Sequence, residues 1–456
     1  MDPNQEHNII KNAFNLSKQP GKTKEAYNAV LTLYQEGELS DNSHLQFGWI
    51  AYRYLKDHYP TIGSKASRTV LATYFKLNVE RPSLLHSVFL VLAINIKKQY
   101  PDFRFSAFMD LWGYDNFRNE DWQPYVHEQY TLPSTVQKVI NMYVAEIKTP
   151  DGFKPSEHFL TLLSKAVAHY PKDYNIARYL AQALITQGKK DDAIQLYRKL
   201  LLQDNRFYLW NELGKLLDDA SLQKSALCMA LLKQKKEEFV GAIHLSLAEL
   251  LIAEKDYPQA LFDLNKYRKT YESNGWPLKY RYKQLMQQIP PATQAAKREN
   301  KWLRKNAEAI NIFVLQQLPT SIMVLRDVFT SKKGKTMCKL LAHDMSTTAA
   351  DLETFPLLKD KEQIFFRVFY TRDDNWTKVV HIEPATDDDA KSEWKDNIKM
   401  IEGKVRITEK GGGKRFGFVS NCYVDQQFLN GITSGTTLKV IALKENDRLR
   451  AIKVVQ

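Results

Sequence analysis

The apolar residues of this chain follow two different periods, and the change between them divides the sequence. From residue 23 to about residue 290 they recur at steps of three and four, the spacing of one face of a helix. From residue 310 onward, runs rich in β-branched and aromatic residues are separated by polar turns, as in β-strands. The sequence therefore predicts a helical region followed by β-structure.

Residues 1–150 are predicted to form a degenerate α-helical region without a strict repeat. The helices expected there cover residues 23–35, 45–57, 84–99, 106–112 and 135–147. Aromatic residues are dense among these helices and include Trp112, Tyr114 and Trp122. Two interpretations remain open: the rings pack between helices, or they line a groove for a partner.

Residues 151–290 repeat a pair of helices. Ala193, Ala226 and Ala260 recur at intervals of 33 and 34 residues, each in a short helix after a turn. The helices upstream of them are expected at residues 176–186, 209–217 and 244–253. A small side chain at the recurring position allows the two helices of a pair to cross closely.

This repeat resembles the tetratricopeptide repeat. The resemblance rests on Trp210-x-x-Leu213-Gly214 and on the turn from Gly188 to Ala193, which Lys255–Ala260 repeats in the third copy. Proteins of that family stack helix pairs into an extended concave surface. The resemblance therefore implies a protein or peptide partner in the helical-repeat groove.

A basic segment follows Pro290-Pro291. Residues 291–309 are predicted to form a connecting helix, covering 292–306, whose cations are Lys297, Arg298, Lys301, Arg304 and Lys305. Such a run of charge is either a solvated helix face or a phosphate contact.

Residues 310–385 are predicted to form a small β domain, either a barrel or a sheet. Its strands are expected at residues 322–325, 336–340, 364–370 and 379–382, with polar turns between them. An acidic linker, residues 386–399 with Asp387, Asp388 and Asp389, is expected to connect this domain to the last one.

Residues 400–456 are predicted to form a five-stranded barrel. The expected strands are residues 404–408, 415–419, 422–424, 437–442 and 449–455. Five is the strand number of the OB-fold.

This last region carries the candidate site. Because alternate residues of a strand share a face, Phe416 and Phe418 should lie side by side, with Tyr423 on the next strand. Gly417 between them is expected to permit a close approach by a ligand or another backbone. Aromatic rings framed by cations such as Lys414 and Arg415 are typical of a stacking platform for unpaired bases. The alternative is that both phenylalanines belong to the core of an unrelated barrel.

The same residues resemble the cold-shock domain, over about 55 residues. Lys414, Phe416, Gly417, Phe418 and Val419 match its first nucleic-acid motif, and Tyr423-Val424 match the centre of the second. Ile407 stands where that family usually has tryptophan, Asp425 replaces a histidine, and the loop between the motifs is shorter. The resemblance implies that Phe416, Phe418 and Tyr423 stack on bases, while Lys404, Arg406, Lys414 and Arg415 contact phosphates.

The positive net charge of the chain favours an acidic partner. The 456 residues carry a formal net charge of +13, spread along the chain, which favours nucleic acid first and anionic membrane second. The polar, acidic start is unlike a signal peptide, and no apolar run reaches the roughly 20 residues of a membrane span. Three scattered cysteines have no disulfide or metal spacing. We expect a soluble, cytoplasmic protein without a membrane partner.

The sequence offers no convincing catalytic motif. Two Gly-Lys-Thr triplets, at Gly21 and Gly334, lack the earlier glycine of a phosphate loop, since Leu16 and Phe329 stand there. The histidines lack the spacing of a zinc helix, and no nucleophile elbow or dinucleotide fingerprint occurs. No catalytic residue, cofactor or metal is predicted.

The predicted fold class is a multidomain α + β protein: a helical solenoid, a small β domain and a C-terminal OB-like barrel. The predicted function is a non-catalytic adaptor for single-stranded RNA or DNA, RNA more than DNA, and for a protein partner. The architecture and the texture around residues 111–118 resemble accessory proteins of bacterial mobile-element and defence systems. The alternatives are a purely protein-binding scaffold and, less favoured, a nuclease.

Overall fold

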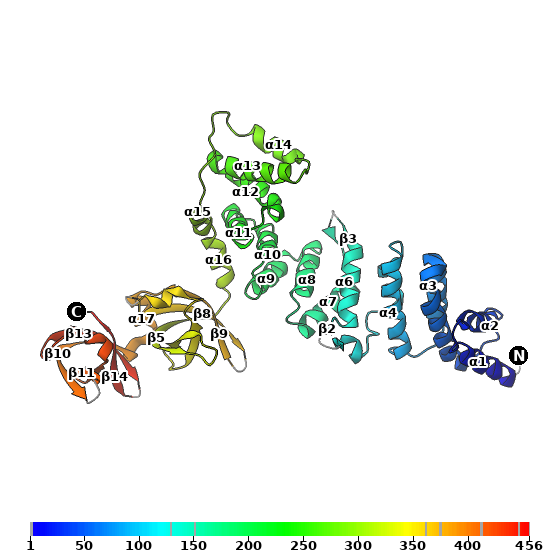
Figure 1. Cartoon of the computed structure of the whole chain (residues 1–456), viewed down its shortest axis with the longest axis horizontal. Helices are drawn as coiled ribbons and strands as arrows, with labels where there is room; N and C mark the ends of the chain where they lie inside the picture. Colours follow the sequence, from blue (N-terminus) through cyan, green and yellow to red (C-terminus); the bar gives the residue numbers. More distant parts are fainter. Residues whose placement is uncertain are drawn as a thin grey trace. The chain divides into compact units, whose positions relative to one another are not determined.

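The computed structural model describes residues 3–127, 130–149, 152–360, 363–373, 376–410, 414–445 and 447–455. The chain divides into two compact units, Met1–Leu216 and Leu217–Gln456. Figure 1 shows the first unit as helices coloured blue to green, and β-structure coloured yellow to red towards the C-terminus of the second. The prediction of a multidomain α + β protein is confirmed.

The first unit is built from successive helices. They are α1 (Pro3–Leu16), α2 (Thr23–Gln35), α3 (His44–Phe75), α4 (Leu84–Gln99), α5 (Phe105–Trp112), α6 (Thr135–Ile147), α7 (Glu157–His169), α8 (Tyr174–Thr186), α9 (Lys190–Leu201) and α10 (Phe207–Gly214), with the 3-10 turns η1 (Asp41–Ser43) and η2 (Asn119–Trp122). Two short antiparallel strand pairs also occur, β1 (Tyr125–His127) with β2 (Tyr130–Leu132) and β3 (Lys148–Thr149) with β4 (Gly152–Phe153). Side-chain caps fix several helix starts; Ser134 and Gln137, for example, form a capping box at α6.

The aromatic residues of this unit pack between helices. Trp112 is fully buried, its ring stacks on His86 at 4.5 Å, and its indole N–H donates to the carbonyl oxygen of His86. Burial lowers the pKa of His86 to about 4. Tyr114 is also buried, and the ring of Trp122 stacks on that of Tyr170. The packing interpretation is therefore confirmed for Trp112 and Tyr114, which cannot line a groove.

The second unit continues the helix pairs. Its helices are α11 (Ala220–Lys233), α12 (Gly241–Ala253), α13 (Tyr257–Ser273), α14 (Tyr280–Gln287), α15 (Asn300–Asn306) and α16 (Glu308–Leu315), with η3 (Glu237–Phe239). Ala226 in α11 and Ala260 in α13 are fully buried, like Ala193 in α9 of the first unit. The repeating alanines therefore occupy tightly packed positions, as the sequence predicts.

The predicted connecting helix at residues 292–306 is wrong over its first half. Residues 292–299 form no helix, and only α15 is helical. The reason is Arg298, whose guanidinium binds both carboxylate oxygens of Asp263 at 2.7 and 2.9 Å and the side chain of Gln259. Residues 310–315, expected to begin the β domain, instead form α16, where the backbone N–H of Ile310 donates to Ser225.

The small β domain is an antiparallel five-stranded sheet. Its strands are β5 (Thr320–Thr330), β6 (Thr336–Leu341), β7 (Thr347–Asp351), β8 (Phe365–Asp373) and β9 (Trp376–Pro384), in the order β7-β6-β5-β8-β9, with the 3-10 turn η4 (Pro356–Lys359) after β7. Cys338, Leu340, Phe366 and Val368 are fully buried on one side of it. The short strand β7, rich in threonine and alanine, was not predicted from the sequence.

The acidic segment predicted as a linker, residues 386–399, does connect the sheet to the barrel, but it is helical over much of its length. Residues 387–394 form α17 (Asp387–Trp394), followed by η5 (Lys395–Asn397). Thr386 and Asp389 cap the helix reciprocally, and Asp389 also binds Arg367 at 2.9 Å. Trp394 is buried between sheet and barrel, and its indole N–H donates to the carbonyl oxygen of Ile322.

The last domain is a closed five-stranded barrel, as predicted. Its strands are β10 (Ile398–Lys410), β11 (Lys414–Val419), β12 (Cys422–Val424), β13 (Thr437–Glu445) and β14 (Arg448–Val454), with η6 (Gln426–Phe428) after β12. They close in the order β10-β11-β12-β14-β13, and only the β12–β14 pair is parallel. Valine side chains from four strands fill the interior. Closure pairs each described strand of the barrel with two neighbours.

Candidate nucleic-acid interface

Three aromatic rings gather on the outside of the barrel. The ring centroids of Phe416 and Tyr423 lie 5.9 Å apart and nearly parallel, while the ring of Phe418 meets the other two edge-on at 6.0 and 5.8 Å. Phe418 is 37% exposed, and Phe416 and Tyr423 are half-buried. We call these three residues the aromatic platform. Each ring leaves part of its surface open to a planar ligand.

The alternation of β11 produces this platform. Gly417 and Val419 point into the barrel and are buried, so Phe416 and Phe418 point outward. A Cβ atom on Gly417 would lie 2.9 Å from a methyl group of Val405 and 3.2 Å from the carbonyl oxygen of Arg406. Of the two close approaches expected at Gly417, the structure shows that of another backbone, strand β10, and not that of a ligand. Glycine is needed there because the inner face is tightly packed.

The platform continues into a row that crosses four strands. Directly opposed residues of neighbouring strands share a face. Phe418 opposes Arg406 of β10 on one side and Tyr423 of β12 on the other, and Tyr423 in turn opposes Arg450 of β14. The four residues Arg406, Phe418, Tyr423 and Arg450, which we call the open row, place a guanidinium at each end of two rings.

Arg450 was not among the residues predicted from sequence. It lies in the last strand with buried Ala451 beside it, so the alternation was visible, but nothing local indicates which strand pairs with β12. Its guanidinium lies 3.7 Å from the carboxylate of Asp425, which also accepts the backbone N–H of Gln427. Asp425 thus offsets part of the positive charge at this end.

The four predicted phosphate contacts differ in their surroundings. Lys404 and Arg406 are exposed on β10 and form no ion pair within the described part of the chain. The guanidinium of Arg415 donates to the carbonyl oxygens of Leu429 and Ile432 at 3.2 and 2.5 Å, which fixes the loop after η6. Lys414 begins β11, and its side chain lies outside the described residues.

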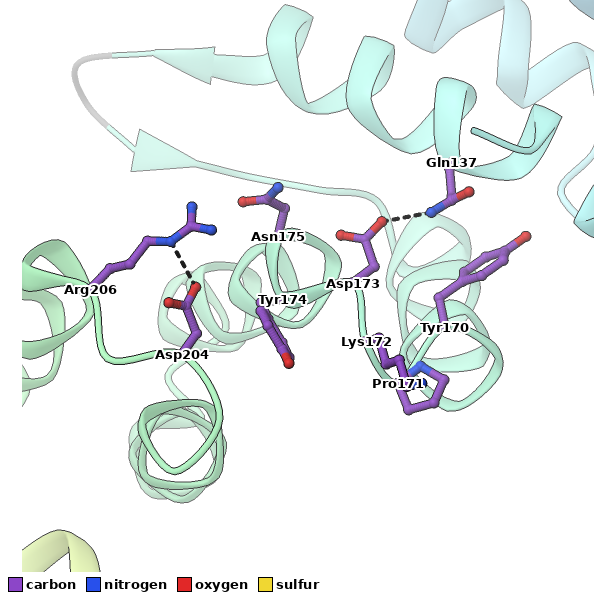
Figure 2. Close-up of a pocket in the computed structure, with 9 residues that line it drawn as sticks. All are labelled: Gln137, Tyr170, Pro171, Lys172, Asp173, Tyr174, Asn175, Asp204 and Arg206. Carbon is purple, nitrogen blue, oxygen red and sulfur yellow. Dashed lines mark hydrogen bonds and ion pairs between the residues drawn. The ribbon is translucent and has the colours of Figure 1, made fainter. Parts of the chain in front are cut away.

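A cleft in the first unit is the second candidate site. It has a volume of about 560 Å³ and lies between the starts of α8 and α10. Figure 2 shows Gln137 of α6 bound to Asp173 on one side of the opening and Arg206 bound to Asp204 on the other. Exposed Lys172 and Asn175 complete a rim of mixed charge, and such a rim suits a polar segment of another protein.

Residues 176–309 match the family described as Domain of unknown function (DUF7017). The matched span runs from α8 to the start of α16 and includes Arg298 with its partner Asp263. The match therefore includes the connecting segment as well as the helix pairs. The sheet and the barrel lie outside it. The curated proteins include no match to the chain.

The cysteines, the possible metal ligands and the apolarity of the helices also bear on a functional role. Cys228, Cys338 and Cys422 are buried free thiols, and burial raises the pKa of Cys228 to about 12. Within the described ranges, no three histidine, cysteine or acidic side chains are grouped so that they could bind a metal ion. None of the described helices has both the length and the apolarity needed to cross a membrane.

Proposed function

We propose that this protein is a non-catalytic adaptor that binds single-stranded nucleic acid on the barrel and a protein partner on the helix pairs. The observation that carries the proposal is the open row. Stacking on an exposed ring is available to every base, and flanking guanidinium groups suit the phosphates on either side. RNA is proposed ahead of DNA, since RNA-binding modules commonly stack unpaired bases on aromatic side chains.

Topology supports the barrel's part in this proposal. The first strand pairs with the second and fourth, and the third pairs in parallel with the fifth. We take this arrangement as OB-like, and OB-folds often bind oligonucleotides. Together with the motif at residues 414–419, it makes the barrel look like a cold-shock domain.

The helix pairs support the proposed protein partner. Buried alanines at the recurring positions look like those of tetratricopeptide repeats, and arrays of that kind usually bind peptides or proteins. The cleft beside α8 is the proposed place of contact, since its charges of both signs can pair with a polar segment.

The test is a titration of the full chain with fluorescent oligo-pyrimidine RNA and DNA at two salt concentrations. The double variant Phe416→Ala/Phe418→Ala should lose most of the salt-dependent binding, because two stacking surfaces are removed. Phe239→Ala is a matched control: Phe239 is also exposed beside a lysine, Lys236, but in η3. A folded double variant that binds as tightly as the unchanged chain would contradict the proposal.

A purely protein-binding scaffold is the alternative. Two observations favour it: Asp425 places a negative charge beside the platform, and Arg415 is engaged by backbone carbonyl groups. The same titration separates the two functions. A scaffold whose barrel only supports the fold binds no single strand at either salt concentration.

A further inference from the structure

We infer that the hairpin formed by β5 and β6 is a second nucleic-acid contact, reached by a single strand that leaves the barrel at Arg450. This inference rests on the proposed function of the open row. It extends the site from the barrel to the neighbouring sheet and sets a minimum length for the ligand.

The open row ends at the sheet. Beyond Arg450, the opposed residue on β13 is Leu443. Leu443 is buried in a cluster with Val324 of β5 and Trp394 of α17, so the sheet covers the barrel at this point. A strand that follows the row past Arg450 therefore meets the sheet next.

An ion pair joins the barrel to the base of the hairpin. Glu445, two residues after Leu443 on β13, lies 3.3 Å from Arg326 of β5. From Arg326, β5 continues to Thr330, and Val328 and Phe329 on this stretch are 55% and 42% exposed. Phe329 opposes Met337 on β6. An exposed aromatic ring thus lies between the barrel and the hairpin tip.

The hairpin tip presents lysines from a fixed turn. The backbone N–H of Gly334 donates to the carbonyl oxygen of Ser331, and that of Lys335 donates to the hydroxyl of Ser331. Gly334 has a φ of +76°, a left-handed conformation that favours glycine. Lys332 and Lys333 are exposed, and neither has an ion pair among the described residues. Lys335 is instead paired with Asp351 at 3.2 Å.

The geometry sets the length of ligand that can reach both places. From Phe418 to β13 is three strand spacings, about 14 Å, and from Arg326 to Thr330 is another ~13 Å along β5. The platform and the tip are thus on the order of 30 Å apart along the surface, which about nine nucleotides span at the spacing of a stacked strand. A shorter oligomer reaches only the platform.

The experiment compares oligo-uridine of about five and about twelve nucleotides on the full chain, with the salt dependence of each. The unchanged protein should bind the longer oligomer at least tenfold more tightly. Lys332→Gln/Lys333→Gln should reduce this gain to less than threefold and lower the salt slope for the longer oligomer by about 1.4, because roughly 0.7 is lost per phosphate contact. Binding of the shorter oligomer should not change.

Lys235→Gln/Lys236→Gln is the control, since it removes an equal charge from two adjacent exposed lysines near η3. It should leave the gain intact. A tip variant that keeps the full gain, or an unchanged protein that shows no gain, overturns the inference while the proposed function stands. If neither oligomer binds, the proposed function fails and the inference fails with it.

Discussion

Two clusters of arginine and aromatic residues in the second unit have similar chemistry and opposite surroundings. In the first, the guanidinium of Arg298 lies 4.6 Å from the ring of Phe262 and 4.1 Å from that of Trp302, and it binds Asp263 with both terminal nitrogens. The side chains of Arg298 and Asp263 are 2% and 0% exposed. In the second cluster, the open row, Arg406 is exposed and Phe418 is partly so.

The difference shows what separates a structural cluster from a candidate site. Around Arg298 the donors and the ring faces are already engaged by the protein, so the cluster stabilises the fold and offers nothing to a ligand. In the open row, part of each ring and the guanidinium of Arg406 remain accessible to solvent. Residue type alone, and therefore sequence alone, does not distinguish the two.

The largest effect is expected from Arg298→Ala. Removing Arg298 leaves the buried carboxylate of Asp263 with His244 as its remaining partner, which should lower the free energy of unfolding by about 3–5 kcal/mol. Urea unfolding of the full chain measures this loss. The neighbouring Lys297→Ala, at an exposed position, should change stability little. A loss below 1 kcal/mol for Arg298→Ala would show that this cluster does not hold the connecting segment.

Phe418→Ala should act on binding instead. Loss of one stacking surface should weaken the binding of single strands by roughly 1–3 kcal/mol. The free energy of unfolding should change less, because the ring is partly exposed already. Phe418→Tyr keeps the ring and should keep the affinity. If the alanine variant loses stability and not affinity, the platform is core, and the contrast with Arg298 disappears.

Arg406→Gln should produce a smaller change. One phosphate contact fewer lowers the dependence of log affinity on log salt by about 0.7, with an affinity loss of a few-fold at low salt. Titrations at three or more salt concentrations give this slope. Arg68→Gln removes an exposed arginine from the first unit and should leave it unchanged. Equal slopes in both variants would remove Arg406 from the interface.

The smallest effect is expected from pH, acting on the buried cluster around Arg298 and Asp263. Burial lowers the pKa of His244, but its bonds to Asp263 at 2.7 Å and Glu237 at 3.1 Å outweigh burial and raise the pKa above 6.5. Arg298 and Lys266, bound to these two carboxylates, are the nearby cations. Since the folded state retains the proton, the stabilisation is complete below about pH 6.5 and is lost as the pH rises through the raised pKa.

Unfolding experiments at pH 6 and pH 9 test this sign. The unchanged protein should lose more stability over this interval than His244→Gln, which has no proton to release. At low pH a different group, Glu237, limits the stability of the cluster, because the bond from His244 lowers the pKa of its carboxyl group to about 2. A His244→Gln variant with the same pH dependence as the unchanged chain would contradict the assignment.

Much of the fold could be predicted from local pattern. The helices at residues 23–35, 84–99 and 135–147 have the predicted bounds, and all five barrel strands were found. These elements have strong periodicity or clear turn signals. The strand β7 lacked both, and α17 was obscured by its three aspartates, one of which has a distant partner in Arg367.

The candidate site could be predicted only in part. Alternation placed Phe416 and Phe418 on one face, and the structure brings Tyr423 beside them. Whether these rings bind nucleic acid stays a prediction. The sequence could not separate Arg415, which binds carbonyl groups in the loop after η6, from Arg450, which the parallel pairing of β12 with β14 brings next to Tyr423.

The sequence by itself therefore determined the local elements and the face on which each residue lies, because 3.6- and 2-residue periods depend only on neighbours in the chain. The tertiary structure alone decided which cations and rings meet, and which are already engaged. Asp263 and Arg298 form their ion pair with 34 residues of chain between them. Tyr423 meets Arg450 only because β14 returns beside β12. Such pairings depend on long-range packing, which no local pattern encodes.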